Sequence, residues 1–340
     1  MLWSNTINNS LLDQGANGLA ATSRAYDIND SGLIVGNTLD VGSSEKRGSY
    51  WLYSTWQSNF SVVNAGQNFA VTDSNITSIN DQGIMVGHQI LQEYTTGGTP
   101  TNNYYTNIFM HQAFAGDAIF ASTPELFTSN QHIPASINNI NLYAGTGRFN
   151  GFEGDAGGIN ELPTFVSIAD RNDNNSMVGM DDAGLCKVVS LQSGVIPSHS
   201  FSNDTGAPCL PDSINNNDVV VGRYEVDVAL NTPHAFVYEY TPTAQCTSGF
   251  RDLNDFTLLP DGVVLAQATD VNESGVIVAK GEVNGLTRAY LLTPAAESAP
   301  IPTQLDINNN GVIDACETSP ANDTPIDVAV LMVIINSILL

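Results

Sequence analysis

The sequence has 340 residues, of which 10 are Lys or Arg and 35 are Asp or Glu, giving a formal net charge of −25. A surface of that charge repels phosphate backbones, so the composition excludes a function in nucleic-acid binding. Hydrophobic residues make up 42% and charged residues only 13%, which is typical of a β protein with polar loops and a sufficient core.

One short motif recurs six times and organises the chain. In the first copy, Asn29-Asp30-Ser31-Gly32 is followed by the apolar run Leu33-Ile34-Val35 and ends at Gly36. In every copy an Asn precedes a final small residue by seven positions, which indicates an internal repeat. The six pairs are Asn29 and Gly36, Asn80 and Gly87, Asn138 and Gly145, Asn172 and Gly179, Asn215 and Gly222, and Asn272 and Ala279.

Each copy predicts a strand, a tight turn and a second strand. The Asn and Asp side chains can bond local backbone, and Gly supplies the positive φ that a short turn needs. Asn141, Asn175 and Asp218 replace the turn Gly in three copies, and these residue types tolerate the left-handed conformation better than other non-Gly residues. Residues 170–176 look superficially like a calcium loop, but we interpret them as the turn of the fourth copy.

A weaker aromatic signature follows most copies and predicts a third strand, at residues 50–53, 112–114, 234–238 and 288–292. A fourth, looser strand would lead into the next copy. Successive motif ends lie 51, 58, 34, 43 and 57 positions apart. A four-stranded antiparallel unit repeated at roughly 40–50 residues has the period of a β-propeller blade. We therefore predict an all-β, six-bladed β-propeller of antiparallel sheets over residues 1–297, with almost no helix.

The motif together with the tripeptide His234-Ala235-Phe236 resembles the extracellular repeat proteins called the HAF family. The likeness covers about residues 1–294 and includes the passage Phe250-Arg-Asp-Leu-Asn-Asp-Phe256, which resembles the family's last repeat. The resemblance implies a secreted, propeller-like protein. It transfers no catalytic residue, because the family carries no established chemistry.

The two ends of the repeat region suggest how the ring closes. The N-terminus has no basic or long apolar segment typical of a signal peptide. Residues 1–4 instead resemble residues 51–54, so the chain begins halfway through a repeat unit, while the sixth copy has no polar fourth strand. We expect residues 1–14 to complete the last sheet, with strand exchange between molecules as the alternative.

The cysteines and histidines form no motif with specific chemistry. Cys186, Cys209, Cys246 and Cys316 are too few for a disulfide scaffold, and no CxxC pair favours zinc. In a secreted protein we expect either a Cys209–Cys246 bridge or free buried thiols. The five histidines are scattered, and His234 is interpreted as structural. No catalytic residue is predicted.

Residues 305–340 follow a Pro-rich linker at residues 298–304 and carry the motif with the most specific chemistry. Residues 306–317 match the twelve-residue EF-hand calcium loop, with Gly311 at the sharp turn. The loop resembles those of dockerins and thrombospondin-type repeats. A second dockerin loop is not predicted, since Val328 and Ile334 stand where Gly and an acid belong. The predicted Ca²⁺ ligands are the side chains of Asp306, Asn308, Asn310, Asp314 and Glu317 and the carbonyl of Val312.

Residues 328–340 are almost wholly apolar but too few to span a bilayer. They are either a docking segment for a partner or a neighbouring subunit, or an element packed on the protein's own body.

These patterns favour a non-catalytic extracellular or cell-surface protein used for binding or assembly, stabilised by Ca²⁺ at its C-terminal loop. Its partners would be protein or glycan at the propeller rim, or a second copy through residues 328–340. One alternative is a polysaccharide-acting hydrolase or lyase on a propeller scaffold, suggested by the dockerin-like tail. The other is a structural subunit of a surface layer or filament. No membrane span is expected.

Overall fold

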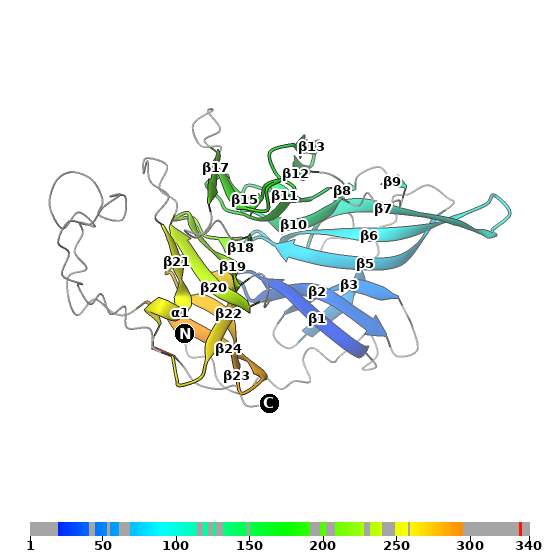
Figure 1. The fold of residues 1–340 in the computed structure, drawn as a ribbon. Helices are drawn as coiled ribbons and strands as arrows, with labels where there is room; N and C mark the ends of the chain where they lie inside the picture. Colours follow the sequence, from blue (N-terminus) through cyan, green and yellow to red (C-terminus); the bar gives the residue numbers. More distant parts are fainter. Residues whose placement is uncertain are drawn as a thin grey trace, which may run out of the picture. The chain divides into compact units, whose positions relative to one another are not determined.

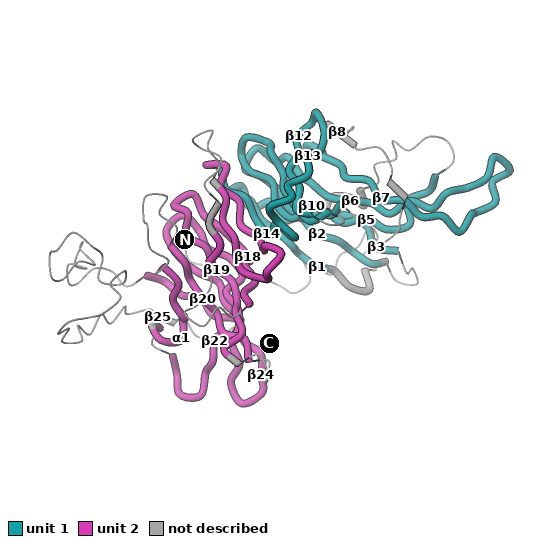
Figure 2. The backbone as a smooth tube through the Cα atoms, turned by 45° about the horizontal axis from the view of Figure 1, so that its top comes forward, with its two compact units in different colours: residues 1–173 teal, residues 174–340 magenta. Residues whose placement is uncertain are grey.

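The computed structural model describes residues 20–40, 45–52, 55–60, 69–113, 118–121, 125–126, 132–147, 150–190, 198–201, 208–227, 232–239, 249–257, 259–294 and 333–334. These residues form six antiparallel sheets and one short helix (Figure 1). The prediction of an all-β protein with almost no helix is confirmed. The chain divides into two compact units, Met1–Asp173 and Asn174–Leu340 (Figure 2).

The first unit holds three sheets and the first strand of a fourth. The first sheet has the order β1 (Ala20–Ile28), β2 (Leu33–Asp40), β3 (Lys46–Leu52) and β4 (Thr55–Phe60). The second has β5 (Phe69–Ile79), β6 (Ile84–Tyr94), β7 (Pro100–Gln112) and β8 (Ala118–Ala121), with β9 (Glu125–Leu126) also paired to β7. The third has β10 (Ile133–Ile137), β11 (Tyr143–Thr146), β12 (Gly151–Asp155) and β13 (Gly158–Leu162).

The second unit continues the same strand order. The fourth sheet begins with β14 (Ser167–Arg171), which belongs to the first unit, and continues with β15 (Ser176–Met180), β16 (Cys186–Ser190) and β17 (Ser198–Phe201). The fifth has β18 (Cys209–Ile214), β19 (Val219–Asp227), β20 (Thr232–Glu239) and β21 (Phe250–Asp252), followed by the helix α1 (Leu253–Phe256). The sixth has β22 (Val264–Val271), β23 (Ile277–Val283), β24 (Leu286–Thr293) and β25 (Val333–Ile334).

Each copy of the motif forms the turn between the first and second strands of a sheet, as the sequence predicts. The three residues that replace the turn Gly are in the left-handed region, with φ of 65° at Asn141, 63° at Asn175 and 60° at Asp218. Gly32 and Gly83 have φ of 76° at the equivalent position. The interpretation of residues 170–176 as a turn is consistent with the positive φ of Asn175.

The glycine that ends the motif is required by close approach of two strands. Gly87 lies opposite Ile76, where the pairing of β5 with β6 shifts register. A Cβ at Gly87 would collide with the carbonyl oxygen of Asn75, and a Cβ at Gly222 would collide in the same way with that of Leu210. The fixed offset between Asn and Gly therefore reflects a β-bulge that recurs opposite the second strand.

The motif asparagines form a ladder of hydrogen bonds between consecutive sheets, which we call the asparagine ladder. In the turns of Asn29, Asn80, Asn138, Asn215 and Asn272 the Asn Oδ1 accepts the backbone N–H four residues on, for example Ile84 N to Asn80 Oδ1 at 2.9 Å. The Nδ2 group donates to the backbone carbonyl of the equivalent Asn in the following repeat. These contacts are Asn29 to Asn80, Asn80 to Asn138 and Asn138 to Asn172, each at 3.0 Å, in the first unit and Asn215 to Asn272 at 2.9 Å in the second.

A second row of hydrogen bonds runs beside the asparagine ladder, through the next residue of each motif. Asp30 N donates to Asp81 Oδ1 at 3.0 Å, Asp81 N to Asn139 Oδ1 at 2.8 Å, and Asn139 N to Asp173 Oδ1 at 2.7 Å. The turns of the first unit are thus joined by at least two hydrogen bonds at each step. Because the acceptor is held in a turn of its own, these bonds fix the spacing of consecutive sheets.

The hydrophobic core lies between successive sheets. One cluster joins the first and second sheets, including Val35, Ile76 and Phe109, and another joins the second and third, including Val86 and Phe152. In the second unit one cluster joins the fourth and fifth sheets and another joins the fifth and sixth. The second strands β6 and β19 contribute to the clusters on both of their faces, which explains their runs of consecutive apolar residues.

The strand register corrects the position of the aromatic signature. Gly222 faces Phe236 across β19 and β20, and the equivalent partner of Gly87 is Phe109. The aromatic residue of the second copy was predicted within residues 112–114, but the one that faces the motif glycine is Phe109. Phe114 lies outside the described residues. The third copy, in which no aromatic was recognised, has Phe152 opposite Gly145.

The expected Cys209–Cys246 bridge is wrong, and so is the alternative of free thiols for Cys209. Cys209 at the start of β18 is bonded to Cys186 at the start of β16, 23 residues earlier. Both side chains belong to the cluster between the fourth and fifth sheets. Cys246 and Cys316 lie outside the described residues.

The fourth position of the last sheet is occupied by β25, from the apolar C-terminal segment. Ile334 pairs with Leu292 and Val333 with Thr293. The prediction that residues 1–14 pair here is wrong at these positions, because the paired strand comes from the C-terminal segment. This pairing corresponds to the second reading of residues 328–340, an element packed on the protein's own body. Residues 1–14 lie outside the described part of the chain.

The asparagine ladder predicts a specific effect of substitutions at Asn80, which is 3% exposed. Replacing Asn80 by Ala removes the bonds to Ile84 N and Asn138 O, so the free energy of unfolding should fall by roughly 2–4 kcal/mol in urea titrations. Replacing it by Asp keeps the turn acceptor but loses the donor, so this variant should also be clearly destabilised. Asn102→Ala, at an exposed position, is the control. Equal stability of Asn80→Asp and the wild-type protein would contradict the ladder's contribution.

Candidate functional site

The predicted calcium ligands lie outside the described residues, together with the linker at residues 298–304. Their geometry therefore stays a prediction. Within the described ranges, no group of three or more His, Cys, Asp or Glu side chains is arranged to hold a metal ion. No helix in those ranges is long and apolar enough to cross a membrane.

The histidines are dispersed, as the sequence indicates. His88 is buried, and burial together with the charge of Lys46 lowers its pKa to about 4, so it is neutral at physiological pH. His132 Nε2 lies 2.6 Å from Glu161 Oε1. His234, in the tripeptide His234-Ala235-Phe236, pairs with Asp252 and belongs to a polar cluster of the second unit.

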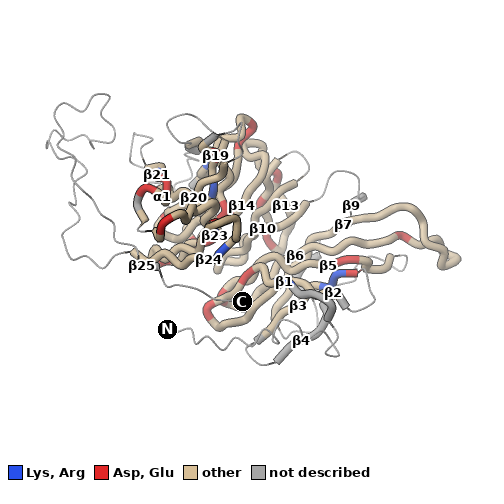
Figure 3. Tube along the Cα trace, turned by 60° about the horizontal axis from the view of Figure 1, so that its bottom comes forward, with Lys and Arg blue, Asp and Glu red and all other residues tan. Residues whose placement is uncertain are grey.

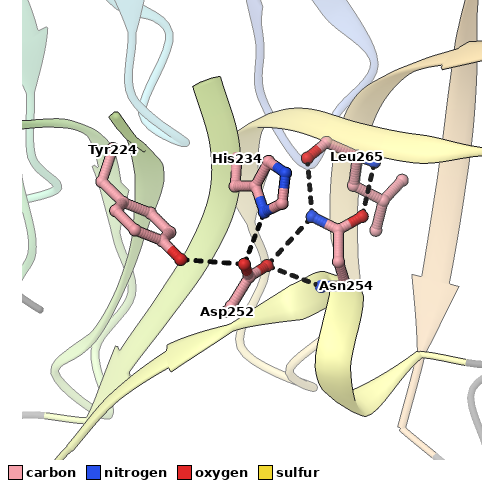
Figure 4. Close-up of polar contacts among 5 residues, drawn as sticks. All are labelled: Tyr224, His234, Asp252, Asn254 and Leu265. Atoms are coloured by element: carbon pink, nitrogen blue, oxygen red, sulfur yellow. Dashed lines mark hydrogen bonds and ion pairs between the residues drawn. The ribbon is translucent and has the colours of Figure 1, made fainter. Parts of the chain in front are cut away.

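This cluster, which we call the Asp252 cluster, consists of Tyr224, His234, Asp252 and Asn254 (Figure 4). Tyr224 lies on β19 and His234 on β20, directly opposite each other in the register. Asp252 ends β21, and Asn254 lies in α1. The side chains therefore come from three adjacent strands of the fifth sheet and from the helix that follows it.

The Asp252 carboxylate accepts four hydrogen bonds. Oδ2 accepts the hydroxyl of Tyr224 at 2.8 Å and lies 2.6 Å from His234 Nδ1. Oδ1 accepts the backbone N–H of Asn254 at 2.8 Å and its side-chain Nδ2 at 2.9 Å. Asp252 is also the N-cap of α1, so one carboxylate both starts the helix and binds the two strands beside it.

Asn254 extends the cluster to the sixth sheet. Its Nδ2 donates to the carbonyl oxygen of Leu265 at 2.9 Å, and its Oδ1 accepts the N–H of Leu265 at 2.7 Å. The amide thus binds β22 in the way that a neighbouring strand would. A continuous chain of hydrogen bonds joins β19, β20, β21, α1 and β22.

The electrostatics of the cluster stabilise the neutral phenol of Tyr224. The pKa of Tyr224 is raised by burial, by its hydrogen bond to Asp252, and by the charges of Asp252 and Asp255. Tyr224 therefore remains a donor at any physiological pH. Four donors on two oxygens occupy the acceptor sites with which the carboxylate could contact a substrate. The arrangement is suited to holding elements together.

A second polar link joins the fifth and sixth sheets at Asp212 on β18. Nε2 of Gln267, on β22, lies 2.9 Å from Asp212 Oδ1 and 2.8 Å from Oδ2. Lys280 Nζ donates to Gln267 Oε1 at 3.3 Å. Burial raises the pKa of Asp212 to about 6, and the Gln267 bond and the charges of Arg223 and Lys280 oppose this rise.

Of the residues in the Asp252 cluster, only His234 was singled out from the sequence. The available signal was the passage at residues 250–256, which contains both Asp252 and Asn254 and resembles the family's last repeat. Tyr224 carried no signal, because its position opposite His234 follows from the register of β19 and β20. Asp212 and Gln267 are 55 residues apart in sequence, and no local pattern connects them.

The Asp252 cluster predicts a large loss of stability for Asp252→Ala. The substitution removes the acceptor of the Tyr224 hydroxyl, of His234 Nδ1 and of the Asn254 backbone N–H, so the free energy of unfolding should fall by about 3 kcal/mol in denaturant titrations. Asp255→Ala, at an exposed position of the same helix, is the matched control and should change it little. If both variants had the same stability, the proposed importance of the Asp252 contacts would be refuted.

The raised pKa of Asp212 predicts that its effect on the free energy of unfolding depends on pH. Because its pKa in the folded protein lies above the ordinary value of 3.8, its contribution to stability is present below pH 4 and is lost as pH rises to about 6. Asp212→Asn should therefore be more stable than the wild-type protein above pH 6, by about 1–3 kcal/mol. The difference should shrink toward pH 4. Thermal unfolding between pH 4 and 8, with Asp261→Asn as the exposed control, measures it. A difference independent of pH would rule out this titration.

Comparison with known proteins does not assign the chain to a family. No family model matches the sequence. No curated protein matches it either.

Proposed function

We propose that the protein is a non-catalytic, extracellular binding or assembly protein, in which six sheets form a six-bladed β-propeller and residues 306–317 bind Ca²⁺. The observation that supports a non-catalytic function is the hydrogen bonding of the Asp252 carboxylate. The Asp252 cluster combines Tyr, His and Asp, which are residue types found in catalytic sites, but its carboxylate accepts four hydrogen bonds from within the protein.

The repeated architecture supports the propeller. In every sheet the first four strands follow one another in chain order, and the motif turn joins the first two. The asparagine ladder joins the same turn of consecutive sheets within each unit. Sheets that are related by one repeated contact and packed face to face are the elements from which a propeller is built.

The extracellular location is supported by covalent chemistry and by charge. The Cys186–Cys209 disulfide is of a kind that persists in oxidising compartments. Acidic residues outnumber basic ones, and Figure 3 shows them distributed over both units. A surface of this net charge keeps a protein soluble at high concentration and attracts divalent cations.

The binding surface that we propose is the β6–β7 ribbon, residues 92–104. It extends past the end of β5, whose pairing with β6 stops at Glu93 (Figure 1). Glu93 Oε2 accepts bonds from Thr101 Oγ1 at 3.1 Å and Asn103 Nδ2 at 2.9 Å, which hold the two strands in place. Tyr104 is 39% exposed. An ordered ribbon that presents Tyr, Asn, Thr and Gly has the composition of surfaces that bind proteins or glycans.

Self-association through residues 328–340 is a further part of the proposal. In the structure Val333 and Ile334 pair with β24 of the same chain. The same pairing made between two chains would be an exchange of strands, which produces oligomers without a new type of contact.

The ribbon can be tested by binding assays. Full-length protein is applied to arrays of polysaccharides and extracellular glycoproteins, and the Kd of each positive probe is measured. Tyr104→Ala should weaken binding at least tenfold, while Ile140→Ala, at a more exposed apolar residue of the same unit, should leave it unchanged. Equal loss in both variants would exclude the ribbon as the binding surface. Release of reducing sugar from a polysaccharide would favour the hydrolase alternative and overturn the non-catalytic assignment.

The calcium loop predicts a measurable binding site. Calorimetry on the full chain should give one Ca²⁺ site with a Kd of about 10⁻⁴–10⁻³ M, as in extracellular modules. Glu317→Gln should weaken it sharply, because it removes charge and bidentate geometry together. Glu297→Gln, at the end of the repeat region, is the control. Equal affinity for the wild-type protein and Glu317→Gln would exclude the site.

A further inference from the structure

The second and fifth sheets carry polar residues at the same register positions of their second and third strands, but only the fifth has a carboxylate beside them on the fourth strand. Across the second and third strands, Tyr224 faces His234 in the fifth sheet, and Gln89 faces Asn107 in the second. Each pair lies two residues from the Gly and Phe that face each other in that sheet. Gln89 and Asn107 therefore occupy the positions of the two side chains that bind Asp252.

The carboxylate has no counterpart in the second sheet. In the fifth sheet, Phe236 pairs with Asp252 on the fourth strand. In the second sheet, the register pairs Phe109 with Ala121, and alanine supplies no acceptor. The second sheet thus has the two polar positions of the Asp252 cluster without the group that binds them together.

Gln89 and Asn107 are nevertheless fully enclosed. Gln89 is 0% exposed and Asn107 is 2% exposed. They lie on the face of the sheet that carries Met85 and Phe109, which pack against the first sheet. Both atoms of each side-chain amide are buried without a hydrogen-bond partner from the protein.

Four unpartnered buried amide atoms are energetically unfavourable. Each buried donor or acceptor that loses its partner carries the full cost of leaving water, and folded proteins supply a partner for nearly all such groups. The two amides offer both donors and acceptors. This set suits a neutral molecule that donates and accepts, whereas an anion needs donors and a cation needs acceptors. Water meets the requirement, with two to four polar partners.

We propose that Gln89 and Asn107 hold ordered water between the first and second sheets, at the position that the Asp252 carboxylate occupies in the fifth. The water completes the polar contacts of β6 and β7, as Asp252 does for β19 and β20. The second sheet is then a hydrated version of the same cluster.

The site is tested on the full-length wild-type protein. A crystal structure at a resolution near 1.5 Å should show water within hydrogen-bond distance of both amides. NMR should show nuclear Overhauser effects from water to the side-chain NH₂ protons of Gln89 and Asn107. Direct bonding of the two amides to each other, with no water density and no such effects, would overturn the proposal.

Substitutions provide a second test. Asn107→Leu leaves Gln89 and the water without one partner, so the melting temperature should fall by several degrees. Gln89→Leu combined with Asn107→Leu removes both polar groups and the need for water, so the double variant should recover most of that loss. A double variant in which the two losses simply add would refute the shared water. This outcome is independent of the binding function proposed for the ribbon.

Discussion

The structure depends on one side chain that does two things at once, the motif asparagine. Its Oδ1 closes the turn of its own repeat, and its Nδ2 donates to the backbone of the next. Other residues can perform the first task. Asp181 and Thr95 stand at the same position of similar turns, and each accepts the N–H four residues on. Neither has an amide group to donate, and neither turn takes part in the ladder. The residue choice is therefore explained by the contact between repeats, since the turn alone would permit Asp or Thr.

The remaining inter-sheet contacts build on this spacing. The core clusters fill the space between neighbouring sheets, and polar links such as Asp252 and Asp212 appear where fifth and sixth sheets meet. The polar links are not repeated from sheet to sheet as the asparagines are. The same positions contain a histidine and a tyrosine in one sheet and two amides in another. The repeat thus keeps a constant turn and core, while its polar positions have diverged and give each interface its own chemistry.

Much of this architecture could be predicted because its signals are local. The turn, the left-handed Asn141 and Asp218, and the strands on either side follow from residue types within a few positions. The sequence could not show that Asn29 and Asn80 bond to each other, because 51 residues separate them and no local pattern encodes the contact. The aromatic residue of the second copy was misplaced for a related reason. Its position is set by pairing with Gly87, so the aromatic residue that packs there is Phe109 and not one of residues 112–114. The disulfide was likewise predicted between Cys209 and Cys246 because they flank the fifth repeat. The true partner, Cys186, is close to Cys209 only because the fourth and fifth sheets stack, which no local pattern shows.

The acceptor of each ladder bond is a main-chain carbonyl, and this has a consequence for how the chain tolerates change. A substitution at one motif asparagine removes the bond that it donates, but it cannot remove the carbonyl that receives the bond from the preceding repeat. Damage at one turn therefore stays in one interface. Changes in separate repeats should combine additively, since they share no side chain. A chain built in this way can lose, duplicate or exchange a whole repeat and still present a receiving carbonyl at every junction. This provides a physical route by which copies of such a unit can vary in number during evolution.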